Sequence, residues 1–299
     1  MHVVDASGSI DAEGNITKPG DGNPIQDAMD IEVELIQWLN RIITHNSQLI
    51  IREETSMSTA RAIAKPLLGI KASELQVLQA LEKSELNPVP FVKWTSSQTY
   101  RFASYLLPII KPTLLIANKM DILTSDGNLE KLMKLYGRNL VAACSAEAEL
   151  VLRRAEKMGV LEYTPGEEKF KINQNAKLTR EQKGALEYVE NRVMNKFMRT
   201  GIQQALNTIV FKLLKMNMVY GVSDETKYTD NHGNVLPDVH LMHDGSTPLD
   251  LAKHIHSRLA EDYVGAIDAK TGERLPADYT LRHKDVIKIQ TQTRKKPNK

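Results

Sequence analysis

The middle of the chain alternates between apolar, strand-like runs and amphipathic helical segments, and this pattern constrains the fold more than any other feature. Strands are predicted at 113–117 and 140–144, and helices at about 128–135 and 146–157. A glycine follows each predicted helix, as is common at helix C-termini. Strands and helices that alternate in this way favour a parallel α/β sheet, which gathers binding residues at the carboxyl ends of its strands.

The sequence Asn118-Lys119-Met120-Asp121 directly follows the first of these strands. An Asn-Lys-x-Asp pattern in this place is the way in which GTP-binding domains hold guanine. The carboxylate accepts from the N1 and N2 donors of guanine, an edge that adenine does not present, while the Lys stem covers the ring and the Asn braces the loop. We therefore predict that Asn118, Lys119 and Asp121 contact a guanine base. The alternative is an ordinary helix N-cap formed by Asp121 or Ser125.

The pair Ser145-Ala146 follows the second strand of the series. In GTP-binding domains a Ser-Ala pair at this place presents backbone N–H groups to guanine O6. A serine N-cap of the next helix explains the pair equally well, and the two interpretations are compatible. We predict that Ser145 and Ala146 complete the base site. We predict no catalytic residue. We also predict no metal site, because the histidines near the C-terminus lack metal-ligand spacing.

The groups that bind nucleotide phosphates are not found in the sequence. It contains no Gly-x-x-x-x-Gly-Lys-Ser/Thr, the loop whose backbone amides surround phosphates. We also expect no Asp-x-x-Gly, ahead of Asn118 and after a strand, at a position to organise Mg²⁺. Phosphoryl transfer depends on positioning and on stabilising phosphate charge. We therefore expect GTP to bind weakly, and no GTP hydrolysis by this chain alone.

Composition bounds the remaining choices. The 299 residues leave room for roughly two domains. A net charge of +2 gives no global attraction to nucleic acid or to membranes. No apolar run approaches the ~18 residues of a membrane span, and no signal peptide is evident. The single cysteine, Cys144, is predicted to be a buried structural thiol and fits a reducing cytoplasm.

The other segments suggest a plan for the whole chain. The first six residues resemble a strand, and a helix is predicted at about 25–45. Its core face is predicted to carry Ile31, Leu35, Trp38, Leu39 and Ile42. The predicted plan assigns 1–175 to an α/β domain with a helical insertion at about 46–110, 176–216 to a helical connector, 217–293 to a second domain and 294–299 to a basic tail.

The second domain is predicted to have a hairpin, then a helix from about 247 to 259, then further strands, which is the order of a ubiquitin-like β-grasp module. Its basic residues are interspersed with acids, so a solvated surface and an RNA-facing patch both remain open. The basic tail likewise fits either a frayed end or a phosphate-backbone contact. The basic residues are Lys253, Arg258, Lys270, Arg274, Arg282, Lys284 and Lys288.

Together these segments resemble the TGS-domain-containing branch of the Obg-related GTPases, the YchF-like group and especially its archaeal form. The segments that carry the resemblance are Val3–Gly8, Asn118–Asp121, Ser145-Ala146, Asn234–Asp238, Gly245–Ala252 and Asp285–Ile289. The resemblance implies the C-terminal strands and helices of an α/β P-loop GTPase domain, followed by an α+β TGS domain. It implies GTP as ligand, Mg²⁺ in the complete protein, and ribosome, rRNA or tRNA as TGS partners.

The departure from the family pattern is large. Family members begin with a phosphate-binding loop and two switch regions, and this sequence starts after all three. We therefore expect the C-terminal part of such a protein, whose first strand has lost its inner neighbour and favours self-association. Two functions follow: the guanine-recognition half of a GTPase, or a ribosome- or RNA-binding module that works without nucleotide.

Overall fold

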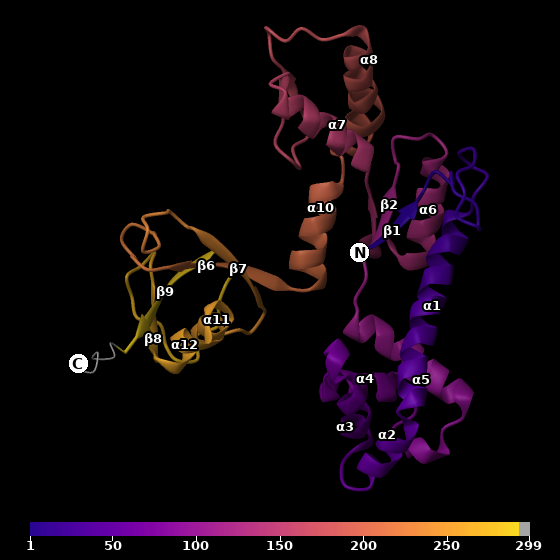
Figure 1. The fold of residues 1–299 in the computed structure, drawn as a ribbon, viewed down its shortest axis with the longest axis vertical. Coiled ribbons are helices and arrows are strands. Elements are labelled where there is room, and N and C mark those ends of the chain that lie inside the picture. Colours follow the sequence, from indigo (N-terminus) through magenta and orange to yellow (C-terminus); the bar gives the residue numbers. More distant parts are fainter. Residues whose placement is uncertain (293–299) are drawn as a thin grey trace, which may run out of the picture. The chain divides into compact units, whose positions relative to one another are not determined.

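A computed structural model describes residues 1–292, so the predicted basic tail at 294–299 lies outside the described residues. The chain divides into two compact units, Met1–Ile209 and a second that begins at Val210 (Figure 1). No helix within 1–292 is both long and apolar enough to cross a membrane.

The first unit is built on a three-stranded parallel sheet. It consists of β1 (His2–Asp5), β2 (Leu115–Asn118) and β3 (Val141–Ala143), in the order β1-β2-β3. Two helices, α1 (Pro24–His45) and α6 (Ser125–Tyr136), lie beside this sheet (Figure 1). Val4, Ala28 and Leu132 form part of their shared core. The predicted parallel α/β arrangement is confirmed.

The helical insertion has a hydrophobic core of its own. It contains α2 (Ser47–Glu54), α3 (Thr59–Ala64), α4 (Glu74–Lys83) and α5 (Ser96–Ile110). Helix α4 begins with the predicted capping box, in which Ser73 and Gln76 each accept from the other's backbone N–H. The residues Leu39, Ile50, Leu81, Phe102 and Leu106 are almost completely buried in the core.

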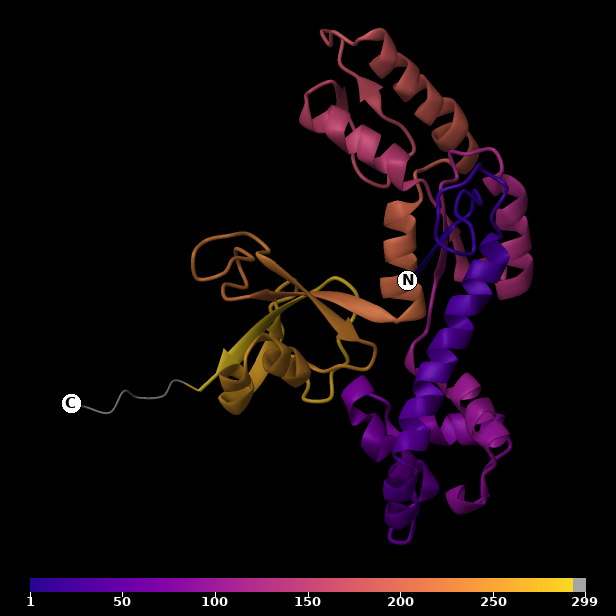
Figure 2. The same cartoon turned by 45° about the vertical axis from the view of Figure 1, so that its right-hand side comes forward.

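Helix α1 belongs to both of these cores, and this corrects one prediction. Its start packs with the sheet through Ala28, and its end packs in the insertion through Leu39 and Ile43 (Figure 2). The seven residues between, 29–35, are all exposed. Ile31 and Leu35, predicted to face the core, are 43% and 44% exposed. Periodicity identified the helix but not the gap between its two packing partners.

After β3 the chain forms α7 (Ala146–Lys157), an antiparallel pair and a run of helices. The pair, β4 (Leu161–Glu162) with β5 (Lys171–Ile172), was not predicted. The helices are α8 (Arg180–Val189), the π-helix η4 (Glu190–Met194), α9 (Asn195–Phe197), α10 (Ile202–Asn207) and the π-helix η5 (Thr208–Leu213). The capping box predicted at Thr179 and Gln182 is present. The connector was predicted to span 176–216, and below the name is kept for its part within the first unit, residues 176–209.

The second unit is a β-grasp fold, as predicted. Its strands are β6 (Met216–Val222), β7 (Asp238–His243), β8 (Tyr263–Asp268) and β9 (Asp285–Thr291), in the order β7-β6-β9-β8. Helix α11 (Pro248–Ile255) contributes Leu251 to a core with Val219 and Ile287. The helix predicted to reach 259 breaks at His256, where the backbone is extended, and continues as α12 (Ser257–Glu261).

Candidate functional site

The carboxyl ends of β2 and β3 bring the five predicted base-site residues together. Ser145 Oγ donates to Asp121 Oδ1 at 2.6 Å, and the Ala146 N–H donates to Asn118 Oδ1 at 3.0 Å. These bonds join two loops that are more than twenty residues apart in the sequence. Parallel strands place their carboxyl ends at one edge, which explains the convergence.

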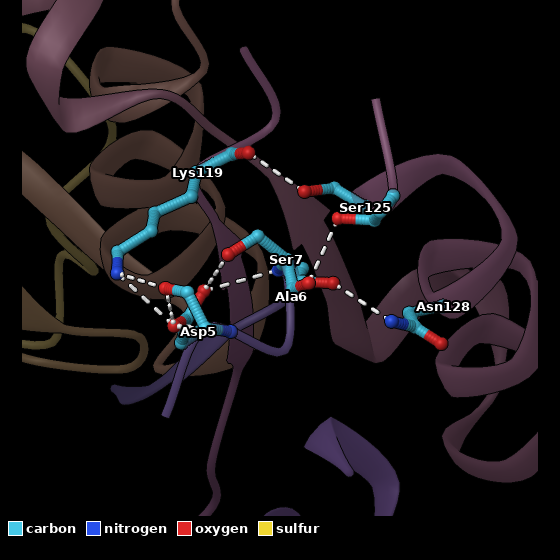
Figure 3. Close-up of polar contacts among 8 residues, drawn as sticks. Asp5, Ala6, Ser7, Lys119, Ser125 and Asn128 are labelled. Carbon is cyan, nitrogen blue, oxygen red and sulfur yellow. Dashed lines mark hydrogen bonds and ion pairs between the residues drawn. The ribbon is translucent and has the colours of Figure 1, made fainter. Parts of the chain in front are cut away.

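Asp121 is held in place but keeps acceptor capacity. Within residues 1–292, Ser145 is the donor to Oδ1, and Oδ2 accepts no hydrogen bond. The alternative of a helix cap at Asp121 or Ser125 is wrong, because Thr124 is the N-cap of α6. Ser125 instead donates its Oγ to the Lys119 carbonyl at 2.7 Å (Figure 3). A carboxylate with a free oxygen can accept two parallel N–H donors such as those of guanine.

Ser145 is the N-cap of α7, as predicted, and it makes a second bond that was not predicted. Its Oγ caps α7 by accepting from the Ala148 N–H at 3.1 Å, and it also donates to Asp121. The backbone N–H groups expected to face guanine O6 are engaged within the protein: that of Ser145 donates to the Thr200 carbonyl at 2.8 Å, and that of Ala146 to Asn118. A base bound here must share or displace these bonds.

Lys119 is fixed by a polar cage at the end of β1. Its backbone is left-handed, with φ 64°, and its Nζ donates to Asp5 Oδ2 at 3.0 Å and to Ser9 Oγ at 2.8 Å (Figure 3). Asp5 also accepts from the Ser7 and Ser9 hydroxyls, each at 2.6 Å. Burial alone would raise the pKa of Asp5, but these hydrogen bonds and the Lys119 charge lower it. Sequence reasoning missed this pair, which spans 114 residues.

Asp5-Ala6-Ser7-Gly8 fits the Asp-x-x-Gly pattern and begins at the last residue of β1. Its carboxylate, however, is occupied by two serines and Lys119, and β1 pairs directly with β2, where Asp5 lies opposite Asn118. In this structure Asp5 therefore pairs with Lys119 and holds its side chain in place.

Cys144 lies directly before Ser145 and is a free, buried thiol. It is buried, and burial raises the pKa of its thiol to about 12. The thiol lies 3.5 Å from Asn118 Oδ1, to which it donates. The prediction of a structural thiol is confirmed. Separately, residues 1–292 contain no group of three or more His, Cys, Asp or Glu residues that could hold a metal ion.

Behind the Ser145 loop lies a buried carboxylate, Glu149, which is another residue that sequence reasoning missed. Its side chain is 7% exposed and accepts from Thr200 Oγ1 at 2.5 Å and Tyr163 Oη at 2.8 Å, and it pairs with Arg153 at 2.6 Å. Burial raises the pKa of Glu149, but the three hydrogen bonds outweigh burial and lower it below its ordinary value of 4.5.

We predict an acid-sensitive contribution to stability from Glu149. A lowered folded-state pKa stabilises the fold above the unfolded pKa, and this stabilisation is lost as the pH falls through the folded value. Glu149→Gln should therefore lower the urea midpoint at pH 7. Below about pH 4.5, the midpoint of this variant should fall less than that of the wild type. Glu147→Gln, an exposed change on the same helix, is the control. Equal pH dependence in the wild type and Glu149→Gln would contradict the prediction.

Fold and site together define a guanine-motif α/β domain followed by a TGS-type β-grasp. A family model for the Obg-like GTPase YGR210-like, G4 motif-containing domain matches residues 116–224, and the TGS domain model matches 228–291. A GTP-binding protein of Methanocaldococcus jannaschii is 38% identical over 288 residues, covering 96% of this chain and 71% of the relative. The chain belongs to the YchF-type branch of the Obg-like GTP-binding proteins.

Two further relatives support this membership. The crystal structure of a GTP binding protein from Pyrococcus horikoshii OT3 is 35% identical with a TM-score of 0.75, covering 98% of this chain and 78% of that one. A GTP-binding protein of Schizosaccharomyces pombe is 23% identical over 282 residues, covering 91% of this chain and 68% of the relative.

Proposed function

We propose that this chain binds guanine nucleotides through base contacts from Asn118, Lys119, Asp121, Ser145 and Ala146. The observation that carries the proposal is the Asp121 carboxylate, which Ser145 holds by Oδ1 while Oδ2 stays open to a donor. Guanine supplies two donors on one edge, and adenine cannot match them. The first turn of α7 adds a favourable end for an oxygen ligand, since helix N-termini carry partial positive charge.

We further propose that this binding is weak and that the chain does not hydrolyse GTP alone. The sequence contains no phosphate-binding loop, so GTP, GDP and GMP should bind with similar affinity. Tight GTP binding, GTP hydrolysis and Mg²⁺ binding would then require a site that has phosphate-binding groups. Titration of labelled GTP with and without Mg²⁺ tests this. Micromolar or tighter, Mg²⁺-dependent binding would contradict it.

A second proposed role is ribosome or RNA association through the TGS domain, and it could operate without nucleotide. The family match at 228–291 supports it. The charged surface supports it less, because five of the seven basic side chains already have protein partners. These are Lys253 with Asp250, Lys270 with the Lys284 carbonyl, Arg274 with the Val264 carbonyl, Arg282 over the Tyr279 ring, and Lys288 with Glu225.

Binding to ribosomal RNA at several salt concentrations tests this role. Phosphate contacts should make the affinity fall steeply with salt, and removal of residues from Met218 onward should abolish it. Failure to bind RNA or ribosomes even at low salt would eliminate the role.

The open edge of β1 leads to a prediction of self-association. The His2 and Ala6 N–H groups donate to the Leu114 and Asn118 carbonyls at 2.9 and 3.1 Å. Successive residues of a strand direct their backbone groups to opposite sides, so Val3 directs its own away from β2, and its side chain is 59% exposed. Such an edge can pair with a second strand. We expect Val3→Lys to lower the dimer fraction in sedimentation, and Val33→Lys on exposed α1 to leave it unchanged. A wild-type monomer with slow amide exchange over residues 2–6 would contradict this.

A further inference from the structure

The connector contacts the backbone of the loop that carries Asp121. Tyr188 donates its hydroxyl to the Asp121 carbonyl at 2.7 Å, and Arg192 Nε donates to the same oxygen at 3.0 Å. The Arg192 guanidinium also donates to the Ile122 carbonyl at 3.0 Å, and its side chain is only 14% exposed. Arg192 and Tyr188 therefore donate to the carbonyl oxygens of the two residues directly after Met120.

The same arginine fixes the far end of this loop. Its guanidinium donates to Asp126 Oδ2 at 3.1 Å, and Lys196 pairs with the same oxygen. Asp126 lies in the first turn of α6, so the loop from Asp121 to Asp126 is held at both ends. Arg192 lies in η4, and π-helical turns are frequent at functional sites.

The end of the connector meets the other base-site loop. The Thr200 carbonyl accepts the Ser145 N–H at 2.8 Å. Gly201, with φ 89°, lies so close to β3 that an added Cβ would be 2.0 Å from the Ala143 carbonyl oxygen. The connector thus contacts the Asp121 loop through side chains and the Ser145 loop through its backbone.

We propose that the connector positions both loops for the base, with Tyr188 and Arg192 as positioning residues for Asp121 and Thr200 for Ser145. This inference rests on the proposed guanine binding. A loop whose carbonyls are fixed presents its carboxylate without an ordering cost at binding. By linkage, if a ligand that moves the connector changes guanine affinity by some factor, guanine changes the affinity of that ligand by the same factor.

Amide hydrogen exchange of the nucleotide-free full chain tests the positioning directly. In Arg192→Ala we expect at least tenfold faster exchange of the Met120 and Ser125 N–H groups, with unchanged exchange in the insertion core at Leu81. Arg192→Lys should recover part of the protection, because a lysine ammonium can replace only some of the hydrogen bonds that the planar guanidinium donates. Arg199→Ala, which removes a connector arginine paired with Glu168, is the matched control. Unchanged loop exchange in Arg192→Ala would overturn the inference.

Titration with GMP and with AMP separates this inference from the proposed function. Arg192→Ala should weaken GMP binding at least tenfold, while Arg199→Ala should bind GMP as the wild type does. Neither the wild type nor either variant should bind AMP. If the wild type itself fails to prefer GMP, the proposed function fails, and the exchange result still decides the loop positioning. If loop exchange accelerates but GMP affinity stays the same, the role of the connector in base binding is wrong.

Discussion

Asp121→Asn is expected to remove guanine recognition and to create a preference for xanthine. Guanine offers donors at N1 and N2, whereas xanthine offers an N1 donor and an O2 acceptor. A carboxylate matches the first pattern, and a carboxamide, with one acceptor and one donor, matches the second. Charged hydrogen bonds contribute roughly 1.5–3 kcal/mol each, so losing the match should weaken guanine binding by about 100-fold or more.

The measurement is a pair of titrations with GMP and XMP, followed by amide shifts of the loops at Asp121 and Ala146. The control is Asp278→Asn, an exposed substitution in the second unit. It should leave the GMP preference intact. If Asp121→Asn bound GMP as the wild type does, Asp121 would not contact the base.

Gly201→Ala is expected to have the largest effect on stability near the site. The Cβ would lie 2.0 Å from the Ala143 carbonyl oxygen and 2.8 Å from Cys144 Cα, both backbone atoms that cannot move aside cheaply. Left-handed strain costs about 1–3 kcal/mol, and overpacking adds about as much. We therefore expect local opening beside Cys144 to become about 100-fold or more easier, since about 1.4 kcal/mol is tenfold.

Cys144 provides the probe for this opening, because it is the single cysteine and is buried. The rate of its labelling by a thiol reagent should rise about 100-fold in Gly201→Ala, following the opening equilibrium. Gly159→Ala is the control: its φ is 70°, but nothing lies within 4 Å of the added Cβ, so it isolates the backbone strain. Equal labelling rates in the two variants would contradict the close packing of Gly201 on β3.

Much of the fold could be predicted because it depends on local patterns. Alternating strands and helices identified the parallel sheet, and the capping boxes at Ser73 and Thr179 marked two helix starts correctly. The β-grasp order also followed from short strands and one helix. By contrast, the β4–β5 pair has only two residues in each strand, too few to produce a periodicity.

The candidate site was predicted only in part, for a physical reason. The five base-site residues follow their strands directly, so the motif and the parallel sheet together locate them. The residues that hold them come from distant segments: Asp5 pairs with Lys119 from 114 residues away, and Arg192 reaches Asp121 from 71 residues away. Such partners depend on tertiary packing, and neither spacing nor composition of a single sequence indicates them.

An amide-shift titration of the full chain tests whether the Asp121 and Ser145 loops recognise guanine. We predict that GMP shifts the signals of Asp121, Ala146 and Glu147, that AMP does not, and that GDP and GTP bind no more tightly than GMP. Absence of shifts with GMP, or equal shifts with AMP, would show that these loops do not recognise guanine.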